Sequence, residues 1–286
     1  MSDLGAAAWE FLWHPAFAAF EAAVRARLSE CTRFPAPHEL SALARGIPNA
    51  LAPWFEFAPQ NQAELDAAGG YDRFIAQNAR IPTRLGSYHD LLGALIWLHF
   101  PACKTAIHRA QLGPQPVRRG PRQNAATLFD ESGVLVLARD PELFERLTAL
   151  NWVDVFFTRR AELAHDARFV GFGHGLLDVL RAPHPRVMGK ALFVRVSVAQ
   201  WALGPSELRV WLDAALAPRL ASFLSEPARL APLPVLGVPA WAPEQTLSFY
   251  QDASYFQTAR SRSRAAHAPA WLDLTQAERA RIAISP

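Results

Sequence analysis

The sequence is poor in two residue types, cysteine and lysine. Cys31 and Cys103 are the only cysteines in 286 residues, which is too few for a disulfide framework and lacks the paired spacing of a zinc motif. We therefore expect a reducing compartment. Of the 29 basic residues, only Lys104 and Lys190 are lysines, so 29 − 2 = 27 are arginines. The two lysines either mark places that need a compact ammonium or survive by chance.

Secretion and membrane signals are also absent from the pattern. The first residues, MSDLGAAAWEFLWHPAFAAF, have no basic start and are interrupted by Asp3 and Glu10. The longest apolar stretches, such as LLGALIWLHFPAC, are shorter than the roughly 20 residues of a bilayer span. We expect a cytoplasmic protein without membrane contact.

What the sequence does contain is enough apolar material for a large core. Hydrophobic residues make up 51% and charged residues 19%, as in compact globular proteins. The net charge of +3 with a pI near 9.2 is close to balanced at this length. The basic segment ARSRSR at 259–264 belongs to no recognised RNA-binding motif, so nucleic acid is a weak candidate partner.

The patterns predict a helix-dominated α+β fold in a single domain. The run ATLFDESGVLVLA combines two β-type segments with turn residues, which predicts a hairpin near 125–138. The proline-rich and aromatic segment that begins at Ala231 is expected to form an extended C-terminal arm packed on the body. The expected units are one domain at 1–265, with a helical part at 1–113, a mixed part at 122–230 and the arm at 231–258, followed by a C-terminal tail at 266–286.

The stretch RLGSYHDLLGALIWLHFPACK, residues 84–104, is the first candidate site. A helix here would place apolar residues on one arc and His89, Asp90 and Lys104 on the other, with His99 as a satisfied core histidine. Asp90 would either orient His89 or act only as a helix cap. Pro101 decides whether the chain bends enough to bring Lys104 near the histidine.

The stretch GFGHGLLDVL, residues 171–180, is the second candidate site. It is predicted to be a strand, a glycine-rich turn and a helix that starts near His174, where a neutral imidazole could act as a base or metal ligand. A turn built only for packing is the alternative. Asp130 and Glu131 are assigned to the hairpin turn. The loop arginines Arg118, Arg119 and Arg122 are candidate phosphate ligands.

Several of these motifs together resemble one family. Arg84, HDLLGALIWLHFPACK, the pattern R-x-x-A-x-T-L-F-D-E-S-G at 122–133, FGHGLLD, and PLPVLGVPAW followed by FYQD are similar to the uncharacterised bacterial "domain of unknown function 3025" family. The resemblance covers residues from about 8 to about 265 and implies no activity. It implies motif positions at Arg84, His89, Asp90, Trp97, Pro101, Lys104, Asp130, Glu131 and His174. The chain departs from the family pattern at Gly93 and His108, where asparagine is usual.

The leading functional hypothesis is an enzyme, a hydrolase or transferase acting on an anionic, phosphate-bearing small molecule. His89, Asp90 and His174 are the candidate catalytic residues, acting through acid–base or metal chemistry. Arg84, Lys104 and Arg122 are the candidate ligand-binding residues. The sequence assigns no metal, cofactor or oligomeric state. The alternatives are a non-catalytic module that binds an anion or nucleic acid, and a protein-interaction domain.

Overall fold

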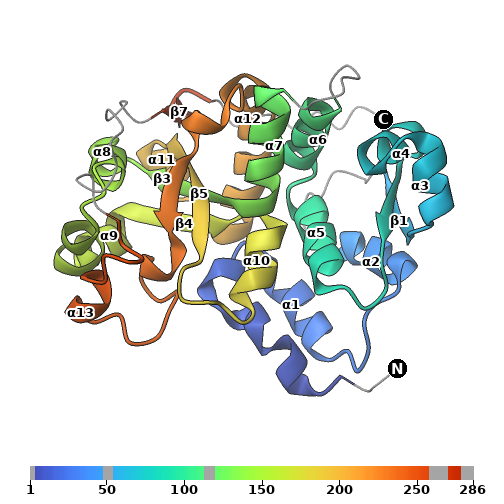
Figure 1. The fold of residues 1–286 in the computed structure, drawn as a ribbon, viewed down its shortest axis with the longest axis horizontal. Helices are drawn as coiled ribbons and strands as arrows, with labels where there is room; N and C mark the ends of the chain where they lie inside the picture. Colours follow the sequence, from blue (N-terminus) through green and yellow to red (C-terminus); the bar gives the residue numbers. More distant parts are fainter. Residues whose placement is uncertain (1–3, 48–53, 113–119, 258–269, 278–286) are drawn as a thin grey trace.

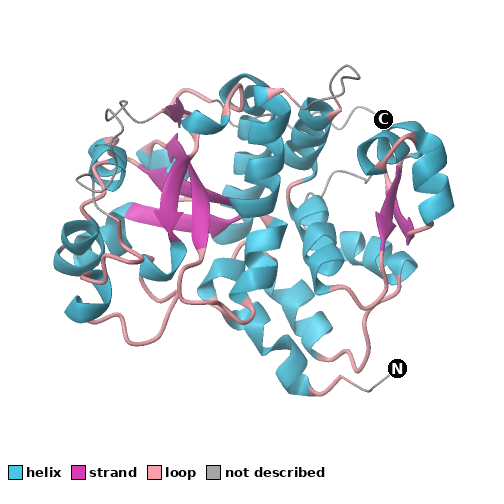
Figure 2. Ribbon diagram, viewed as in Figure 1, coloured by secondary structure: helices cyan, strands magenta, loops and turns pink. Residues whose placement is uncertain are grey.

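A five-stranded mixed sheet forms the centre of the protein. The computed structural model describes residues 4–47, 54–112, 120–257 and 270–277. The strand order is β4-β3-β5-β6, and β7 also pairs with β5 (Figures 1 and 2). The strands are β3 (Gly133–Ala138), β4 (Ala167–Gly171), β5 (Met188–Arg195), β6 (Ala231–Pro234) and β7 (Trp271–Asp273).

Strand β3 is the innermost element of this sheet. It runs antiparallel to β4 and parallel to β5, with Leu135 opposite Val170 and Leu192. All six of its residues are buried. This explains why GVLVLA is apolar throughout and does not alternate, since a strand covered on both faces has no solvent side.

Helices form most of the remaining described structure, so the predicted helix-dominated α+β class is confirmed. Within the described ranges, no helix combines the length and the apolar character needed to cross a bilayer. The α-helices are α1 (Ala22–Ser29), α2 (Pro37–Leu43), α3 (Gln62–Ala68), α4 (Tyr71–Asn78), α5 (Tyr88–His99), α6 (Pro101–Gln111), α7 (Pro121–Ser132), α8 (Glu142–Thr148), α9 (Arg160–Asp166), α10 (His174–Leu180), α11 (Val198–Trp201), α12 (Pro205–Phe223) and α13 (Leu247–Tyr250). The 3₁₀-helical segments are Ala6–Trp13, Pro15–Phe17, Ala44–Gly46, Pro227–Arg229 and Val235–Gly237, and Val153–Thr158 is π-helical.

Four helices stand between the main sheet and a smaller one. The small sheet pairs β1 (Glu56–Pro59) with β2 (Arg80–Thr83) in parallel. Helices α5, α6, α7 and α10 occupy the space between the two sheets (Figure 1). Helix α7 packs against β3, β5 and α6, and α10 packs against α5 and α7. This arrangement brings the two candidate stretches of the sequence into contact.

The predicted hairpin near 125–138 is wrong. Residues 121–132 form α7, and Gly133 ends the helix in an extended conformation and begins β3. The buried residues Ala125, Ala126 and Phe129 follow helical spacing, and Pro121 stands at the first helical position. Because the residue types that favour turns also favour helix ends, the composition of residues 130–133 did not distinguish the two.

The helix predicted within the stretch 84–104 is broken at Phe100. Helix α5 ends at His99 and α6 begins at Pro101, which cannot supply a helical N–H. The next two amides, of Ala102 and Cys103, donate to the Asp213 carboxylate on α12 at 3.0 and 2.8 Å. The prediction of a satisfied core histidine is confirmed for His99, whose ring bonds Leu95 O and Glu21 N.

The proline-rich C-terminal arm packs on the body, as predicted. Tyr250, Tyr255 and Phe256 are buried, and the Tyr255 hydroxyl donates to the Val187 carbonyl at 2.6 Å. The sheet also continues into the segment that we expected to be a tail. There β7 pairs with β5, and the following Leu274 is fully buried.

Candidate active site

Two histidines that lie 85 positions apart in the sequence face each other. His89 is in the first turn of α5, and His174 is the first residue of α10. Their ring centroids are 4.5 Å apart, with an angle of 60° between the ring planes. Gly93, one turn after His89, lies against the His174 ring, because a Cβ there would stand 3.5 Å from the His174 Cδ2 atom. A longer side chain at position 93 would extend into this contact.

The protonation of His174 follows from a single hydrogen bond. Its Nδ1 lies 2.9 Å from the main-chain carbonyl oxygen of Asp130. A carbonyl only accepts, so Nδ1 carries the proton and Nε2 keeps a lone pair in the neutral ring. Burial lowers the pKa of His174 below its usual value, helped by Lys104 and His89 and opposed by Asp130 and Glu131. His174 is therefore a neutral imidazole with one available nitrogen at neutral pH.

The glycine-rich turn before α10 lets this segment pack closely against the end of α7. A Cβ on Gly173 would lie 2.3 Å from the backbone nitrogen of Gly133, so only glycine lets the turn pack against the junction of α7 and β3. A Cβ on Gly175 would lie 2.3 Å from Glu131 Oε2. The Glu131 carboxylate therefore occupies the space that a side chain at position 175 would fill.

Glu131 is a site residue that the sequence interpretation missed. Its Oε1 lies 3.7 Å from His174 Nε2, and its side chain is 43% exposed. His89, Glu131 and His174 each offer one ligand atom, and these atoms all lie within 4.8 Å of one another. The sequence placed Glu131 in a hairpin turn, and only its motif position in the family resemblance could have indicated it.

A buried ion pair lies behind the histidines. Lys104 Nζ contacts Asp130 Oδ1 at 2.5 Å, and the two side chains are only 6% and 10% exposed. Burial tends to raise the pKa of Asp130, but Lys104 and His174 outweigh it and the pKa is lowered. Asp130 is thus ionised, and its Oδ1 lies 3.9 Å from His174 Nδ1. Lys104, which the sequence nominated as an anion ligand, has its ammonium committed to this carboxylate.

Arg84 and Asp90 form a second pair at the start of α5. The guanidinium bonds both carboxylate oxygens, with the shortest contact at 2.7 Å. Asp90 also accepts from the Arg84 backbone N–H and the Ser87 hydroxyl, and Ser87 caps α5. Burial acts to raise the pKa of Asp90, but the bonds from Arg84 and Ser87 lower it overall. Asp90 is therefore not the cap itself, which is Ser87; its carboxylate ties Arg84 to Ser87 and so shapes the turn that carries His89.

Two further polar groups from α4 and α6 lie near these pairs and were not proposed from the sequence. Burial and the nearby carboxylates of Asp90, Asp130 and Asp72 raise the pKa of the Tyr71 hydroxyl, so it stays protonated. His108 is buried, and its Nδ1 lies 3.5 Å from Asp72 Oδ1. As a whole residue Tyr71 is 42% exposed.

Arg122 is not brought to this cluster. Arg122 is exposed in the first turn of α7, whereas Glu131 is in the last turn, about 14 Å farther along the axis at 1.5 Å per residue. Arg118 and Arg119 and the ARSRSR segment lie outside the described residues.

The cluster has the elements of an acid–base site. It combines a neutral imidazole with one lone pair, a second imidazole in contact with it, and a half-exposed carboxylate. Such groups can accept a proton from water or a hydroxyl and return it to a leaving group, or they can share a metal ion.

Comparison with known proteins identifies a family and nothing more specific. No curated protein and no solved structure matches the chain. A family model described as "Protein of unknown function (DUF3025)" matches residues 55–260. This range contains His89, Glu131 and His174 and more than half of the chain, and the protein therefore belongs to the DUF3025 family.

Proposed function

We propose that the protein is an enzyme, a hydrolase or transferase that uses His174 as its general base. The observation that supports this most strongly is the fixed tautomer of His174. Nδ1–H donates a hydrogen bond to the Asp130 carbonyl, and burial keeps the ring neutral, so Nε2 is available to accept a proton at neutral pH.

The proposed proton transfer uses groups already in contact. Nε2 removes a proton from water or from an acceptor hydroxyl as its oxygen attacks the substrate. The imidazolium then donates this proton to the leaving group. The carboxylates of Asp130 and Glu131, at 3.9 and 3.7 Å from the ring nitrogens, stabilise the transient positive charge. His89, in contact with the ring, is the candidate for positioning the substrate or acting as the acid.

We propose a small anionic, phosphate-bearing molecule as the substrate class, with Arg84 as the residue that binds it. Arg84 uses Nε and Nη2 to hold Asp90, which leaves Nη1 outside that pair, and its side chain is 56% exposed. Lys104 contributes indirectly, because it holds the Asp130 carboxylate in place. Arg122 would bind a substrate only if the substrate extended along α7.

We propose that the enzyme works in the cytoplasm. Cys31 and Cys103 are free thiols, and burial raises the pKa of the Cys103 thiol well above its usual value. A buried, protonated thiol of this kind is suited to a reducing compartment but does not require one.

The test is hydrolysis of a panel of phosphate and carboxylate esters by the full chain and its variants. We expect His174→Ala to lower kcat/KM by roughly 10²- to 10⁴-fold, and His165→Ala, which alters an exposed histidine on α9, to have no effect. Because burial lowers the pKa of His174 below the unperturbed histidine value of about 6.5, activity should persist at that pH and fall only under more acidic conditions, where protonation removes the Nε2 lone pair. Turnover that is unchanged in His174→Ala would reject the proposal. Binding of phosphate without turnover would favour the non-catalytic anion-binding module.

A further inference from the structure

We infer that His89, Glu131 and His174 bind one divalent transition-metal ion, with Zn²⁺ as the best match. This goes beyond the proposed hydrolase or transferase activity, because ion binding needs no turnover. The three residues come from α5, the last turn of α7 and the first residue of α10. Nothing in the family description assigns a metal to them.

The spacing of the ligand atoms fits a shared ion. All three lie within 4.8 Å of one another, and His174 Nε2 and Glu131 Oε1 are 3.7 Å apart. Bond lengths of about 2.0–2.2 Å in a tetrahedral zinc site place ligand atoms about 3.4 Å apart. The pair at 3.7 Å is already close to this value. The Glu131 side chain is 43% exposed, so a rotation can adjust the distance from its carboxylate to the two histidines.

The contacts within the trio are those of groups that lack a bridging partner. A distance of 3.7 Å is too long for a hydrogen bond between His174 and Glu131. The ring contact between His89 and His174 brings together two imidazoles that would repel each other if both were protonated. An ion between the three groups would satisfy the carboxylate and both nitrogen lone pairs at once.

The surroundings of His174 favour metal binding over protonation. Histidine ligands of metal ions commonly donate their other N–H to a backbone carbonyl or a carboxylate, and His174 Nδ1 donates to the Asp130 carbonyl. Lys104 neutralises the Asp130 side chain, so Glu131 is left as the carboxylate that faces the histidines.

The ligand set points to the class of ion. Two imidazoles and one carboxylate suit Zn²⁺ and the neighbouring first-row metals far better than Mg²⁺ or Ca²⁺, which prefer oxygen ligands. Three protein ligands leave at least one position open for water. A water molecule held there would lose its proton near neutral pH and would supply an attacking hydroxide. In that state the ion would bind the His174 lone pair, so this hydroxide would replace His174 Nε2 as the group that activates the nucleophile.

The test measures metal binding by the full chain after treatment with a chelator. Zn²⁺ binding is followed by calorimetry, and Co²⁺ is used as a spectroscopic probe whose visible absorption reports on the coordination. We expect one Zn²⁺ per chain. His89→Ala, His174→Ala and Glu131→Gln should each weaken binding by more than about tenfold. Glu131→Gln keeps the size of a half-exposed side chain, so it separates metal binding from folding.

A pair of glycine variants sharpens the test. In Gly175→Ala the new methyl group displaces the Glu131 carboxylate, the far end of a flexible side chain, and should weaken Zn²⁺ binding without unfolding the protein. Gly46→Ala adds a methyl group where no atom lies within 4 Å and should change nothing. Exposed His165→Ala is the matched histidine control.

The outcomes separate this inference from the proposed function. The absence of saturable Zn²⁺ binding, or binding by Glu131→Gln and His89→Ala as tight as that of the unaltered protein, would overturn the metal site. Tight Zn²⁺ binding that depends on His89, Glu131 and His174, without turnover of any ester, would support the metal site and reject only the proposed hydrolase activity. Full turnover after chelation would show that the reaction does not need the metal ion, and it would leave the acid–base proposal intact.

Discussion

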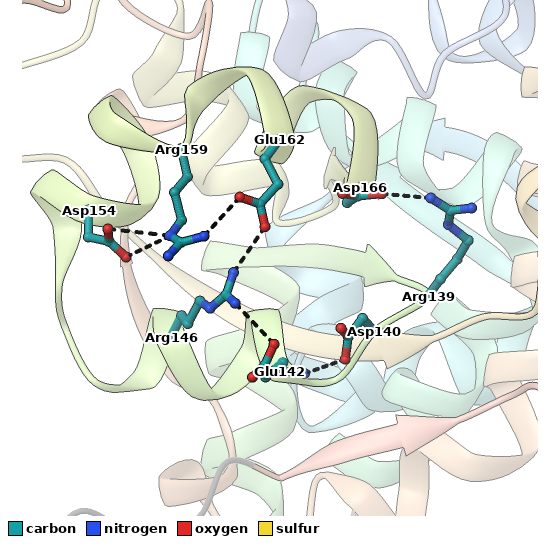
Figure 3. Close-up of polar contacts among 8 residues, drawn as sticks. All are labelled: Arg139, Asp140, Glu142, Arg146, Asp154, Arg159, Glu162 and Asp166. Carbon is teal, nitrogen blue, oxygen red and sulfur yellow. Dashed lines mark hydrogen bonds and ion pairs between the residues drawn. The ribbon is translucent and has the colours of Figure 1, made fainter.

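Two groups of charged side chains in this protein use the same residue types in opposite settings. The first lies on the surface of the segment 139–166 and consists of a network of Asp140, Glu142, Arg146, Asp154, Arg159 and Glu162 and a separate pair of Arg139 with Asp166 (Figure 3). The second is the buried pair of Lys104 and Asp130 behind the two histidines.

In the surface network the partners are shared and accessible to water. Arg146 bonds both Glu142 and Glu162, and Arg159 bonds Glu162 and Asp154 (Figure 3). Side chains that are 30–62% exposed in these pairs can be hydrated if a partner is lost. The pair of Lys104 and Asp130 has no such alternative at 6% and 10% exposure. The difference shows that burial, and not the number of ion pairs, decides which charges control structure.

The largest effect should come from breaking the buried pair. Lys104→Ala leaves the Asp130 carboxylate buried and uncompensated, which should lower the free energy of unfolding by roughly 3–5 kcal/mol. Chemical denaturation followed by circular dichroism measures it. The double variant Lys104→Met/Asp130→Asn removes both charges and should recover much of the loss. A loss from Lys104→Ala no larger than that from a surface arginine would contradict the comparison.

The next effect in size is a dependence of the free energy of unfolding on pH, which differs between buried and exposed ionisable groups. Burial lowers the pKa of His99 to about 4. Between about pH 6.5 and pH 4, His99 is protonated in the unfolded chain but not in the folded chain. The free energy of unfolding therefore decreases as the pH falls from about 6.5 to about 4. The loss is on the order of 3 kcal/mol, at 1.36 kcal/mol per pKa unit.

Denaturation curves at several pH values measure this loss. His99→Gln should be less stable overall but should show a flatter profile between pH 6.5 and 4. The surface carboxylates respond elsewhere, since Arg159 and Arg146 lower the pKa of Glu162 below 4.5 and its contribution is lost only under more acidic conditions. An unchanged slope in His99→Gln would show that another group titrates in this range.

The smallest effect is expected in the surface network. Arg146→Ala removes two exposed ion pairs, whose carboxylates then become hydrated. The denaturation midpoint should move little, and the small difference should vanish at high salt, because salt screens exposed charges. A large, salt-independent loss would mean that the network supports the π-helical segment Val153–Thr158 more strongly than its exposure indicates.

The site itself was only partly predictable. The histidines at 89 and 174 stood out because each lies beside a glycine or a charged residue in an otherwise apolar helix. Glu131 did not stand out, because residues 130–133 carry turn composition and were assigned to a hairpin. The helical spacing of Ala125, Ala126 and Phe129 was the local signal that this assignment overlooked.

The sequence by itself determined the class of the fold and the burial of His99 and of the C-terminal aromatics, and it marked Pro101 as the place where the helix could break. These follow from local chemistry: the missing N–H of proline, apolar periodicity and the cost of exposing rings. Only the tertiary structure decided that the first residue of α10 contacts the first turn of α5, that Glu131 points at both histidines, and that Lys104 faces Asp130 and not a ligand. Such contacts depend on how α5, α6, α7 and α10 pack, and no local pattern encodes the distance between residues that lie 26 or 85 positions apart.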